Sequence, residues 1–414
     1  MPLETVQDNQ WWYSQSVNRP RVESCGFVVL SIGGRECPLI HSELGRDGRP
    51  THSFKFLNAD DRAFWVALRG NQIDIEVVEC GDQVPDLDQA DEDEVDQIDE
   101  PGVPQLLEIP PVSRLTETLF DAYIFVDWSA SSRPKTGADS IWIGAGVFDA
   151  HGTLVVAQPI NPRTRQQAET RVRELLLEHM QEHRRVLVGF DFPYGYPANW
   201  HDAVGLNTGN WHALWNMLAQ QITDDAQNNN NRCDVANNLN AALATFAGPY
   251  WSRPNANAAP YPSLPATKPQ CFANGVVEFR EVEQRLRNSG RHPKSVWQLF
   301  GNGVVASQAL LGIPVLNRLR HEEQLRGCSQ VWPFETGWQC PVGQRPFVLH
   351  AEIWPGSISV VRELHTIKDA AQVLSYVYWA ARLDGAGNLG ARFTPQPAAP
   401  AGGVQKCEGW ILGQ

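Results

Sequence analysis

The chain has 414 residues and a formal net charge of -13, from 34 basic and 47 acidic side chains. This length is enough for two domains that each bury a core. No run approaches the ~20 apolar residues of a transmembrane helix, and the N-terminus has no basic stretch followed by an apolar one, so the sequence argues against a membrane protein and an exported one.

Residues 1–80 predict a small α+β domain. The runs CGFVVLSI, THSFKFL and IDIEVVEC are typical of strands, whereas DDRAFWVALRG predicts a short helix. The polar and sulfur side chains of this region are isolated and form no catalytic constellation. We therefore expect residues 1–80 to have a binding role, with a protein as an open partner class.

Residues 81–113 predict a linker between two domains. Ten acids and no base lie between Asp82 and Glu100, and the proline-spaced EPGVPQLLEIPPV follows. Such a block is typical of a disordered acidic segment. Because it carries most of the excess charge, the rest of the chain is close to neutral, and the net charge says little about ligands. No basic stripe indicates nucleic acid either.

The domain at residues 114–414 opens with the stretch YIFVDWSA. Its apolar run ends in Asp127 and is followed by small hydroxyl residues such as Ser129. Such a run predicts a buried strand, and an acid at its carboxyl end lies where α/β folds bind ligands. A glycine-punctuated hairpin follows, then the helical run TRQQAETRVRELLLEHMQEH, then a second strand in RVLVGFDFPYGYP that ends in Asp191. This order predicts three antiparallel strands beside parallel ones.

Cysteine and histidine patterns do not indicate a zinc site. The eight cysteines are scattered without a C-x-x-C pair, as in a cytoplasmic protein with reduced thiols. His179 and His183 stand four apart on the predicted helix, which could place both on a metal. Their charged neighbours instead predict a solvated helix face.

Residues ~199–275 predict a long inserted loop region. Only NWHALWNMLAQQI has a helical pattern, with Trp211 and Trp215 on one face, and the rest is rich in asparagine and proline. Aromatic residues of the loop, Tyr250, Trp251 and Tyr261, could stack on a base or a sugar. Packing against their own domain is the simpler expectation.

Further acids follow apolar runs later in the chain. Glu335 follows VWPF, Glu352 ends FVLHAE, and Asp369 opens the helical run KDAAQVLSYVYWAARLD. Carboxylates that converge from several strands and one late helix are what two-metal phosphoryl transfer needs, and oxygen ligands suit Mg²⁺ or Mn²⁺. Lys294 or Arg280 could neutralise phosphate charge, although a surface salt bridge explains either residue equally well.

The segments FVDWSAS, GFDFPYGYP, FREVE, PKSVWQLFGNGVVASQALLGIP, VWPFETGW, AEIWPGS, KDAAQV and EGWILG resemble a family of uncharacterised bacterial proteins classed as predicted ribonuclease H-like nucleases. Some of its members are labelled as molybdopterin or cobalamin biosynthesis proteins. The resemblance covers residues ~120–414 and implies a ribonuclease H-like mixed sheet flanked by helices. It implies metal ligands at Asp127, Asp191 and Asp369, with Glu335 as a further ligand and Glu352 as a further catalytic residue. On its motifs lie the candidate substrate-binding residues Ser129, Glu283, Lys294 and Gln298.

The sequence therefore predicts a cytoplasmic, Mg²⁺- or Mn²⁺-dependent phosphodiester hydrolase, with nucleic acid or a nucleotide as the open substrate class and no membrane association. One alternative is an ATP-dependent phosphotransferase of the actin and sugar-kinase type, which would need a second glycine-rich phosphate turn. The sequence shows no convincing turn of this kind, and the lone GNG at residues 301–303, with no clear strand before it, is a weak signal for phosphate binding. The other alternative is a non-catalytic ribonuclease H-like binding module in which the acids are structural.

Overall fold

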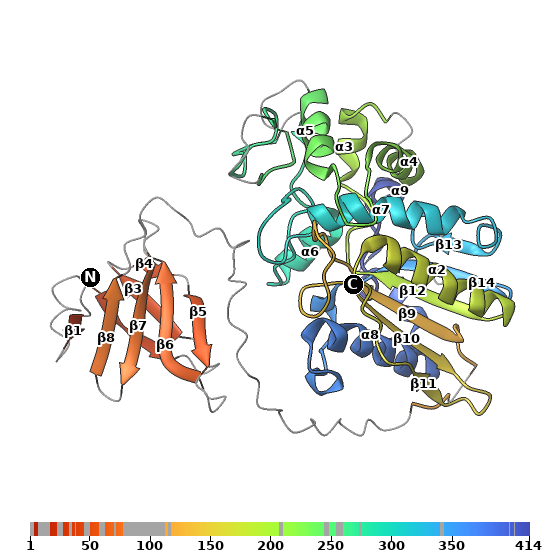
Figure 1. The fold of residues 1–414 in the computed structure, drawn as a ribbon, viewed down its shortest axis with the longest axis horizontal. Coiled ribbons are helices and arrows are strands. Elements are labelled where there is room, and N and C mark those ends of the chain that lie inside the picture. Colours follow the sequence, from red (N-terminus) through yellow and green to blue (C-terminus); the bar gives the residue numbers. More distant parts are fainter. Residues whose placement is uncertain are drawn as a thin grey trace. The chain divides into compact units, whose positions relative to one another are not determined.

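We describe a computed structural model of the chain. It describes the strands that lie between residues 4 and 77, and residues 112–414 apart from 115–116, 207–209, 244–247, 254–259, 273–274, 340–342, 397 and 401. The chain divides into two compact units, Met1–Glu100 and Pro101–Gln414. Figure 1 shows both units, and each is described by itself.

The described elements of the first unit are all strands. They are β1 (Glu4–Val6), β2 (Val17–Val22), β3 (Val28–Ile32), β4 (Arg35–Cys37), β5 (Leu39–Leu44), β6 (Pro50–Leu57), β7 (Ala63–Arg69) and β8 (Gln72–Val77). They form antiparallel sheets in the orders β1-β8-β7-β6-β5 and β2-β3-β4. Strand β7 occupies the run for which the sequence predicts a short helix. Its Phe64, Trp65 and Val66 favour a strand, and β7 pairs with a neighbour on each side.

The second unit is built on a mixed sheet of six strands. These are β9 (Ala122–Asp127), β10 (Trp142–Phe148), β11 (Leu154–Val156), β12 (Arg185–Phe190), β13 (Ser329–Val331) and β14 (Phe347–Glu352). Their order is β11-β10-β9-β12-β14-β13. Strand β10 is antiparallel to both of its neighbours, β9 and β11, whereas β9, β12, β14 and β13 run parallel. This confirms the predicted α/β class, the hairpin after Asp127 and the three antiparallel strands beside parallel ones.

Helices of the second unit surround this sheet. They are α2 (Arg165–Gln181), α3 (Ala198–Ala203), α4 (Trp211–Gln221), α5 (Arg232–Ala242), α6 (Glu281–Asn288), α7 (Ala306–His321), α8 (Lys368–Gly385) and α9 (Gly402–Cys407), with short 3-10 turns at η3 (Pro355–Ser357), η4 (Arg362–Leu364) and η5 (Gly390–Phe393). None of the helices in the described part of the chain has the length and apolar character needed to cross a bilayer.

Two apolar cores separate the helices into layers. Because side chains alternate along a strand, Ile124 and Val126 of β9 pack in the core that includes α2 and α7, whereas Tyr123 and Phe125 pack in the core that includes α8. Figure 1 shows α2 and α7 on one face of the sheet and α8 on the other. The same alternation directs Asp127 to the α8 face. Burial of each large core side chain contributes about 1.5–3 kcal/mol.

The region predicted as a long loop carries three helices. Helix α4 lies where the sequence predicts it, but α3 and α5 were not expected. The sequence of α5, RCDVANNLNAA, has poor helix propensity, yet the helix buries Val235, Ala236 and Leu239. Tertiary burial rather than propensity therefore determines this element. Tyr250 is also fully buried, against Tyr196 and Trp297, so this aromatic packs within its own unit.

His179 does not lie on a solvated helix face. It is buried, and its Nδ1 accepts a hydrogen bond from Arg184 Nη1 at 3.2 Å. Desolvation, followed by the positive charge of Arg184, lowers the pKa of His179 to about 4. His183 is exposed and lies beyond the end of α2. The two rings therefore face different surroundings, and His179 contacts Arg184 rather than solvent.

Residues near the C-terminus pack at the carboxyl end of β14. Ile411 forms an isolated parallel bridge with Glu352 at the end of β14, and the Leu412 amide donates to the Glu352 carbonyl at 2.8 Å. Trp410, Ile411 and Leu412 are buried in the same core as α8. These residues therefore pack on the face of the sheet that carries α8.

Candidate active site

Two aspartates lie side by side at the carboxyl ends of neighbouring strands. Strands β9 and β12 are parallel neighbours, with Val126 opposite Phe190. The Asp191 amide donates to the Val126 carbonyl at 3.2 Å, and the Trp128 amide donates to Asp191 Oδ1 at 2.7 Å. These two hydrogen bonds fix the end of one strand to the end of the other. Asp127 and Asp191 therefore lie at one edge of the sheet, as the sequence predicts.

A third aspartate reaches this edge from α8. Asp369 lies in the first turn of α8 and is 9% exposed, and its Oδ2 accepts a hydrogen bond from the Asp139 amide at 2.6 Å. Helix α8 packs across β9 and β10. At Gly144 of β10, an added Cβ would lie 2.9 Å from the Val373 carbonyl carbon. The missing side chain at Gly144 thus permits the close approach that positions the start of α8.

The charges of these aspartates act on one another. Desolvation raises the pKa of Asp127 well above its ordinary value, and the negative charges of Asp191 and Asp369 raise it further. The charge of Lys368 acts in the opposite direction. Carboxylates that disfavour each other's ionisation must share a site. The three aspartates therefore form one electrostatic cluster, to which β9, β12 and α8 each contribute one member.

Asp191 and Asp369 respond in the same direction. Desolvation raises the pKa of Asp191 to about 7, although the amides of Trp128 and of Asp191 itself lower it. Desolvation also raises the pKa of Asp369, against the hydrogen bond from the Asp139 amide. A carboxyl group with a pKa near neutrality is unusual on an ordinary surface and common in active sites. The cluster thus has the electrostatics of a functional site.

Two lysines border the cluster, and neither was singled out from the sequence. Lys368 immediately precedes Asp369, and its charge lowers the pKa of both Asp127 and Asp369. Lys135 lowers the pKa of Asp369, and its Nζ lies 3.8 Å from the Asp139 carboxylate. Both lysines are exposed. The available sequence signal was their position, since one lies in the loop after the Asp127 strand and the other next to Asp369.

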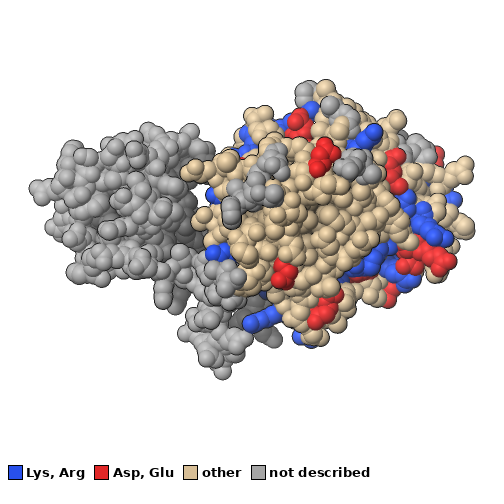
Figure 2. Space-filling view, turned by 90° about the horizontal axis from the view of Figure 1, so that it is seen from above, with Lys and Arg blue, Asp and Glu red and all other residues tan. Residues whose placement is uncertain are grey.

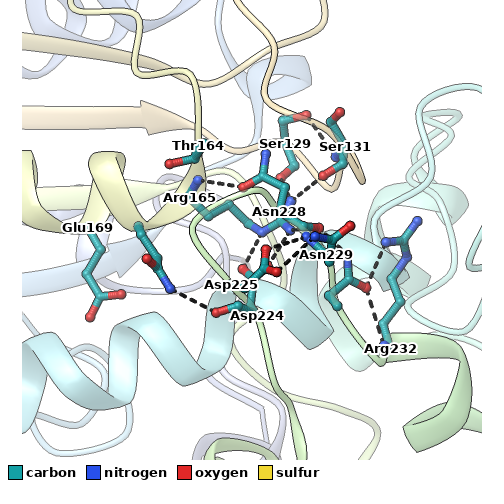
Figure 3. A network of polar contacts seen from close by, with 12 residues as sticks. Ser129, Ser131, Thr164, Arg165, Glu169, Asp224, Asp225, Asn228, Asn229 and Arg232 are labelled. Carbon is teal, nitrogen blue, oxygen red and sulfur yellow. Dashed lines mark hydrogen bonds and ion pairs between the residues drawn. The ribbon is translucent and has the colours of Figure 1, made fainter.

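A buried arginine fixes the loop that follows Asp127. Figure 3 shows Arg165, at the start of α2, between this loop and the segment that carries Asp224. Arg165 Nη1 donates to the carbonyls of Ser129 at 3.2 Å and Ser131 at 2.6 Å. Its Nε and Nη2 each donate to one Asp224 oxygen at 2.6 Å. The guanidinium is fully buried, so the loop rests on a charge-assisted network.

Two further side chains hold the same loop. Arg232, in the first turn of α5, donates from Nη1 to Ser132 Oγ at 3.1 Å, and its guanidinium lies 5.0 Å from the centre of the Phe300 ring. Gln308 of α7 donates to the Trp128 carbonyl. Side chains from α2, α5 and α7 thus hold the segment after Asp127 in place beside the aspartate cluster. None of these three residues was a sequence candidate, because their partners lie far away along the chain.

Glu352 and Glu283, both sequence candidates, lie in a separate ionic network. Glu352 ends β14 as expected, but Arg280 binds its carboxylate through Nη1 at 2.8 Å and Nη2 at 2.6 Å. Arg280 Nε binds Glu283 at 2.9 Å, and Nη1 also donates to the Glu408 carbonyl at 2.8 Å. All of these side chains are buried. Arg280 thus supplies one positive charge to two buried carboxylates, which makes Glu352 and Glu283 parts of this ionic network rather than members of the aspartate cluster.

The remaining candidates have different surroundings. Glu335 forms a two-pronged ion pair with Arg320 at 2.7 and 2.8 Å, and it accepts the Val331 amide. Lys294 is exposed, and Gln298 Nε2 donates to the Phe300 carbonyl at 3.1 Å. Both side chains lie beside the GNG turn, since a Cβ added at Gly301 would lie 2.9 Å from Gln298 Nε2 and one added at Gly303 would lie 4.0 Å from Lys294 Cε. Ser129 adjoins the aspartate cluster, since it follows Asp127 in the loop held by Arg165.

The donor set of the cluster suits a hard divalent cation. Carboxylate oxygens are the ligands that Mg²⁺ and Mn²⁺ prefer, and a bound cation would favour the ionised form that desolvation and mutual repulsion disfavour. Within the described residues, however, no group of three or more His, Cys, Asp or Glu side chains is arranged so that it could hold a metal ion. The aspartates as placed therefore do not form a complete coordination shell.

The surface near the α3–α5 end shows no extended region of one charge sign. Figure 2 shows this face of the second unit, where uncharged residues dominate and basic side chains are mixed with acidic ones.

Searches for similar proteins found no matching protein-family model, no matching curated protein and no matching solved structure. The aspartate cluster is therefore the basis for a functional proposal.

Proposed function

We propose that residues 114–414 form a ribonuclease H-like domain that hydrolyses phosphodiester bonds with Mg²⁺ or Mn²⁺, in nucleic acid or in a nucleotide-containing substrate. The observation that carries the proposal is the cluster of Asp127, Asp191 and Asp369, three carboxylates from two strand ends and one helix that disfavour one another's ionisation. The sheet order supports it, because an antiparallel hairpin follows the first Asp strand and parallel strands lie on its other side.

Each residue in and around the cluster would have its own role in hydrolysis. Asp127 and Asp191 would hold the cation, and Asp369, fixed by the Asp139 amide, would complete the site or orient the attacking water. A bound Mg²⁺ or Mn²⁺ would stabilise charge on the attacking and leaving oxygens of the phosphodiester. Lys135 and Lys368 would attract the substrate phosphate to the rim. The backbone of Ser129 and Ser131, held by Arg165, would keep the wall beside the phosphate rigid.

The direct test is hydrolysis by the full chain in Mg²⁺ or Mn²⁺. The substrates are labelled single-stranded DNA, single-stranded RNA, an RNA–DNA hybrid and a set of nucleotides, and product formation is the readout. Asp127→Asn and Asp191→Asn should each lower the rate at least about 100-fold, because each removes a charged oxygen donor from the cluster. Asp234→Asn is the matched control, since Asp234 is an exposed acid in the first turn of α5.

Two results would overturn the proposal. The first is the absence of hydrolysis for every substrate with either cation. The second is full activity of both aspartate variants. A thermal-shift series with ATP and ADP in Mg²⁺ accompanies the assay, because selective stabilisation by these nucleotides without hydrolysis of phosphodiesters would favour the phosphotransferase alternative.

A further inference from the structure

A pair of histidines lies outside the aspartate cluster. His212, in the first turn of α4, and His321, the last residue of α7, place their Nε2 atoms 3.2 Å apart. Both side chains are exposed. Helices α4 and α7 pack against each other, and Trp211, Trp215 and Leu218 of α4 are buried in the shared core. The two rings therefore project from rigid elements rather than from loops.

The neighbours of the rings indicate which nitrogen can bind a cation. His321 Nδ1 lies 2.8 Å from the Asn317 carbonyl, which can only accept a hydrogen bond, so Nδ1 carries the proton and Nε2 presents its lone pair. His212 Nδ1 lies 3.4 Å from Asn216 Nδ2, and Asn216 Oδ1 accepts a hydrogen bond from Asn317 Nδ2 at 3.2 Å. Metal binding through His212 Nε2 therefore requires the Asn216 amide to turn, so that its oxygen accepts from a protonated Nδ1. A metal-binding histidine commonly donates its second ring N–H to such an oxygen.

The separation of the nitrogens matches shared ligation. Two imidazole nitrogens that each lie about 2.0–2.1 Å from a tetrahedral ion are about 3.3–3.4 Å apart. The observed distance of 3.2 Å therefore requires only a small adjustment. Glu335 and Arg320 also face His212, but they form an ion pair with each other, so their charges largely offset at this position.

We propose that His212 and His321 form a surface site for a divalent transition-metal ion of the Zn²⁺, Ni²⁺ and Cu²⁺ class. The ion would bridge the start of α4 and the end of α7, with water in the remaining positions. Imidazole nitrogens select these ions over Mg²⁺, for which carboxylate oxygens are preferred. The site is therefore chemically distinct from the aspartate cluster and independent of the proposed hydrolase activity.

The test is calorimetric titration of the full chain with NiCl₂ at pH 7.5. Excess Mg²⁺ is present, so that carboxylate sites are already occupied and do not take up Ni²⁺. We expect one Ni²⁺ per chain and a metal-dependent rise in Tm, because an ion that binds only the folded state stabilises it. His212→Ala and His321→Ala should each weaken binding at least tenfold and abolish the rise in Tm. His151→Ala is the control, since His151 is also exposed.

The alternative is that one ring donates an N–H···N hydrogen bond to the other and no ion binds. In that case Ni²⁺ and Zn²⁺ would leave the Tm of the unmutated chain unchanged, and the proposal is overturned. Equal Ni²⁺ affinity in the unmutated chain and both histidine variants would overturn it as well. Unfolding in EDTA shows whether the variants are folded. Loss of hydrolysis in the aspartate variants does not bear on this result.

Discussion

At the scale of single residues, Asp191 links the site to the stability of the fold. The pKa of its carboxyl group is raised from 3.8 to about 7 in the folded protein. The folded chain therefore retains a proton over a pH range in which the unfolded chain has lost it. Stability from this group is fully present below about pH 4 and falls as the pH rises toward 7. Without a divalent cation, the ionised site opposes folding at neutral pH.

Asp191→Asn should consequently stabilise the protein at pH 8 in EDTA. We expect a gain of about 1–2 kcal/mol, less than the full pKa shift implies because the carboxylate is partly exposed to solvent. The difference from the unmutated chain should vanish near pH 4, where both carry a neutral side chain. Urea unfolding between pH 4 and 8 measures this difference. A variant that is less stable at pH 8 would contradict the desolvation and repulsion that disfavour the ionised Asp191 side chain.

The sequence predicts strand-end acids but not their partners. Asp127, Asp191 and Glu352 all follow apolar strands, and the pattern treats them alike. The structure separates them because Arg280, 72 positions before Glu352, binds the Glu352 carboxylate, whereas no arginine neutralises the aspartates in the interactions described. Lys135 and Lys368 were missed for the same reason. The role of each acid depends on which charged side chains lie next to it in the folded chain. No local pattern in a single sequence shows these neighbours.

At the scale of elements, the contact between β10 and α8 determines where Asp369 lies. Gly144→Ala should displace α8, because the added Cβ would approach the Val373 backbone, which cannot rotate away as a side chain can. We expect a loss of about 1–3 kcal/mol in stability and a larger loss of metal-dependent hydrolysis, since Asp369 moves with the helix. Gly327→Ala is the control, because an added Cβ there has no neighbour within 4 Å.

Unfolding and hydrolysis assays of both glycine variants check this prediction. Unchanged stability in Gly144→Ala would mean that the sheet and helix adjust without strain. Unchanged hydrolysis despite lower stability would show that Asp369 is not needed in its present position. Either outcome separates the packing argument from the catalytic one.

Predictability differs among elements for physical reasons. Helices α2 and α8 have apolar residues at regular helical spacing, and the sequence predicts both. Helix α5 is rich in asparagine and is helical because its Val235 and Leu239 are buried. Strand β7 contains alanine and leucine, which favour helices, but it lies between two other strands. The elements that the sequence missed are those whose conformation depends on neighbours.

At the scale of the whole second unit, Glu408 ties together segments that are distant in the sequence. Its Oε1 accepts the Ala198 amide at 2.9 Å and its Oε2 accepts the Glu281 amide at 2.6 Å, so one buried carboxylate serves the N-terminal turns of both α3 and α6. Glu408→Ala should cost about 2–3 kcal/mol, because it leaves two half-buried amide donors at helix starts without their acceptor. Thermal unfolding measures this cost.

Glu363→Ala is the matched control for that substitution, since Glu363 is exposed. Glu408→Gln should fall between the unmutated chain and Glu408→Ala, because the amide retains one acceptor oxygen. Equal stability of Glu408→Ala and the unmutated chain would show that water replaces the lost carboxylate at both helix ends.

The hydrogen bonds of Glu408 also have a consequence for folding during synthesis. A ribosome synthesises Arg280, Glu283 and Glu352 well before Glu408 and Leu412, whose contacts finish the same region. Until those late residues leave the exit tunnel, the nascent polypeptide exposes the apolar surface that Trp410, Ile411 and Leu412 cover in the finished fold. We therefore expect this segment of biosynthesis to be the stage at which molecular chaperones engage the growing chain.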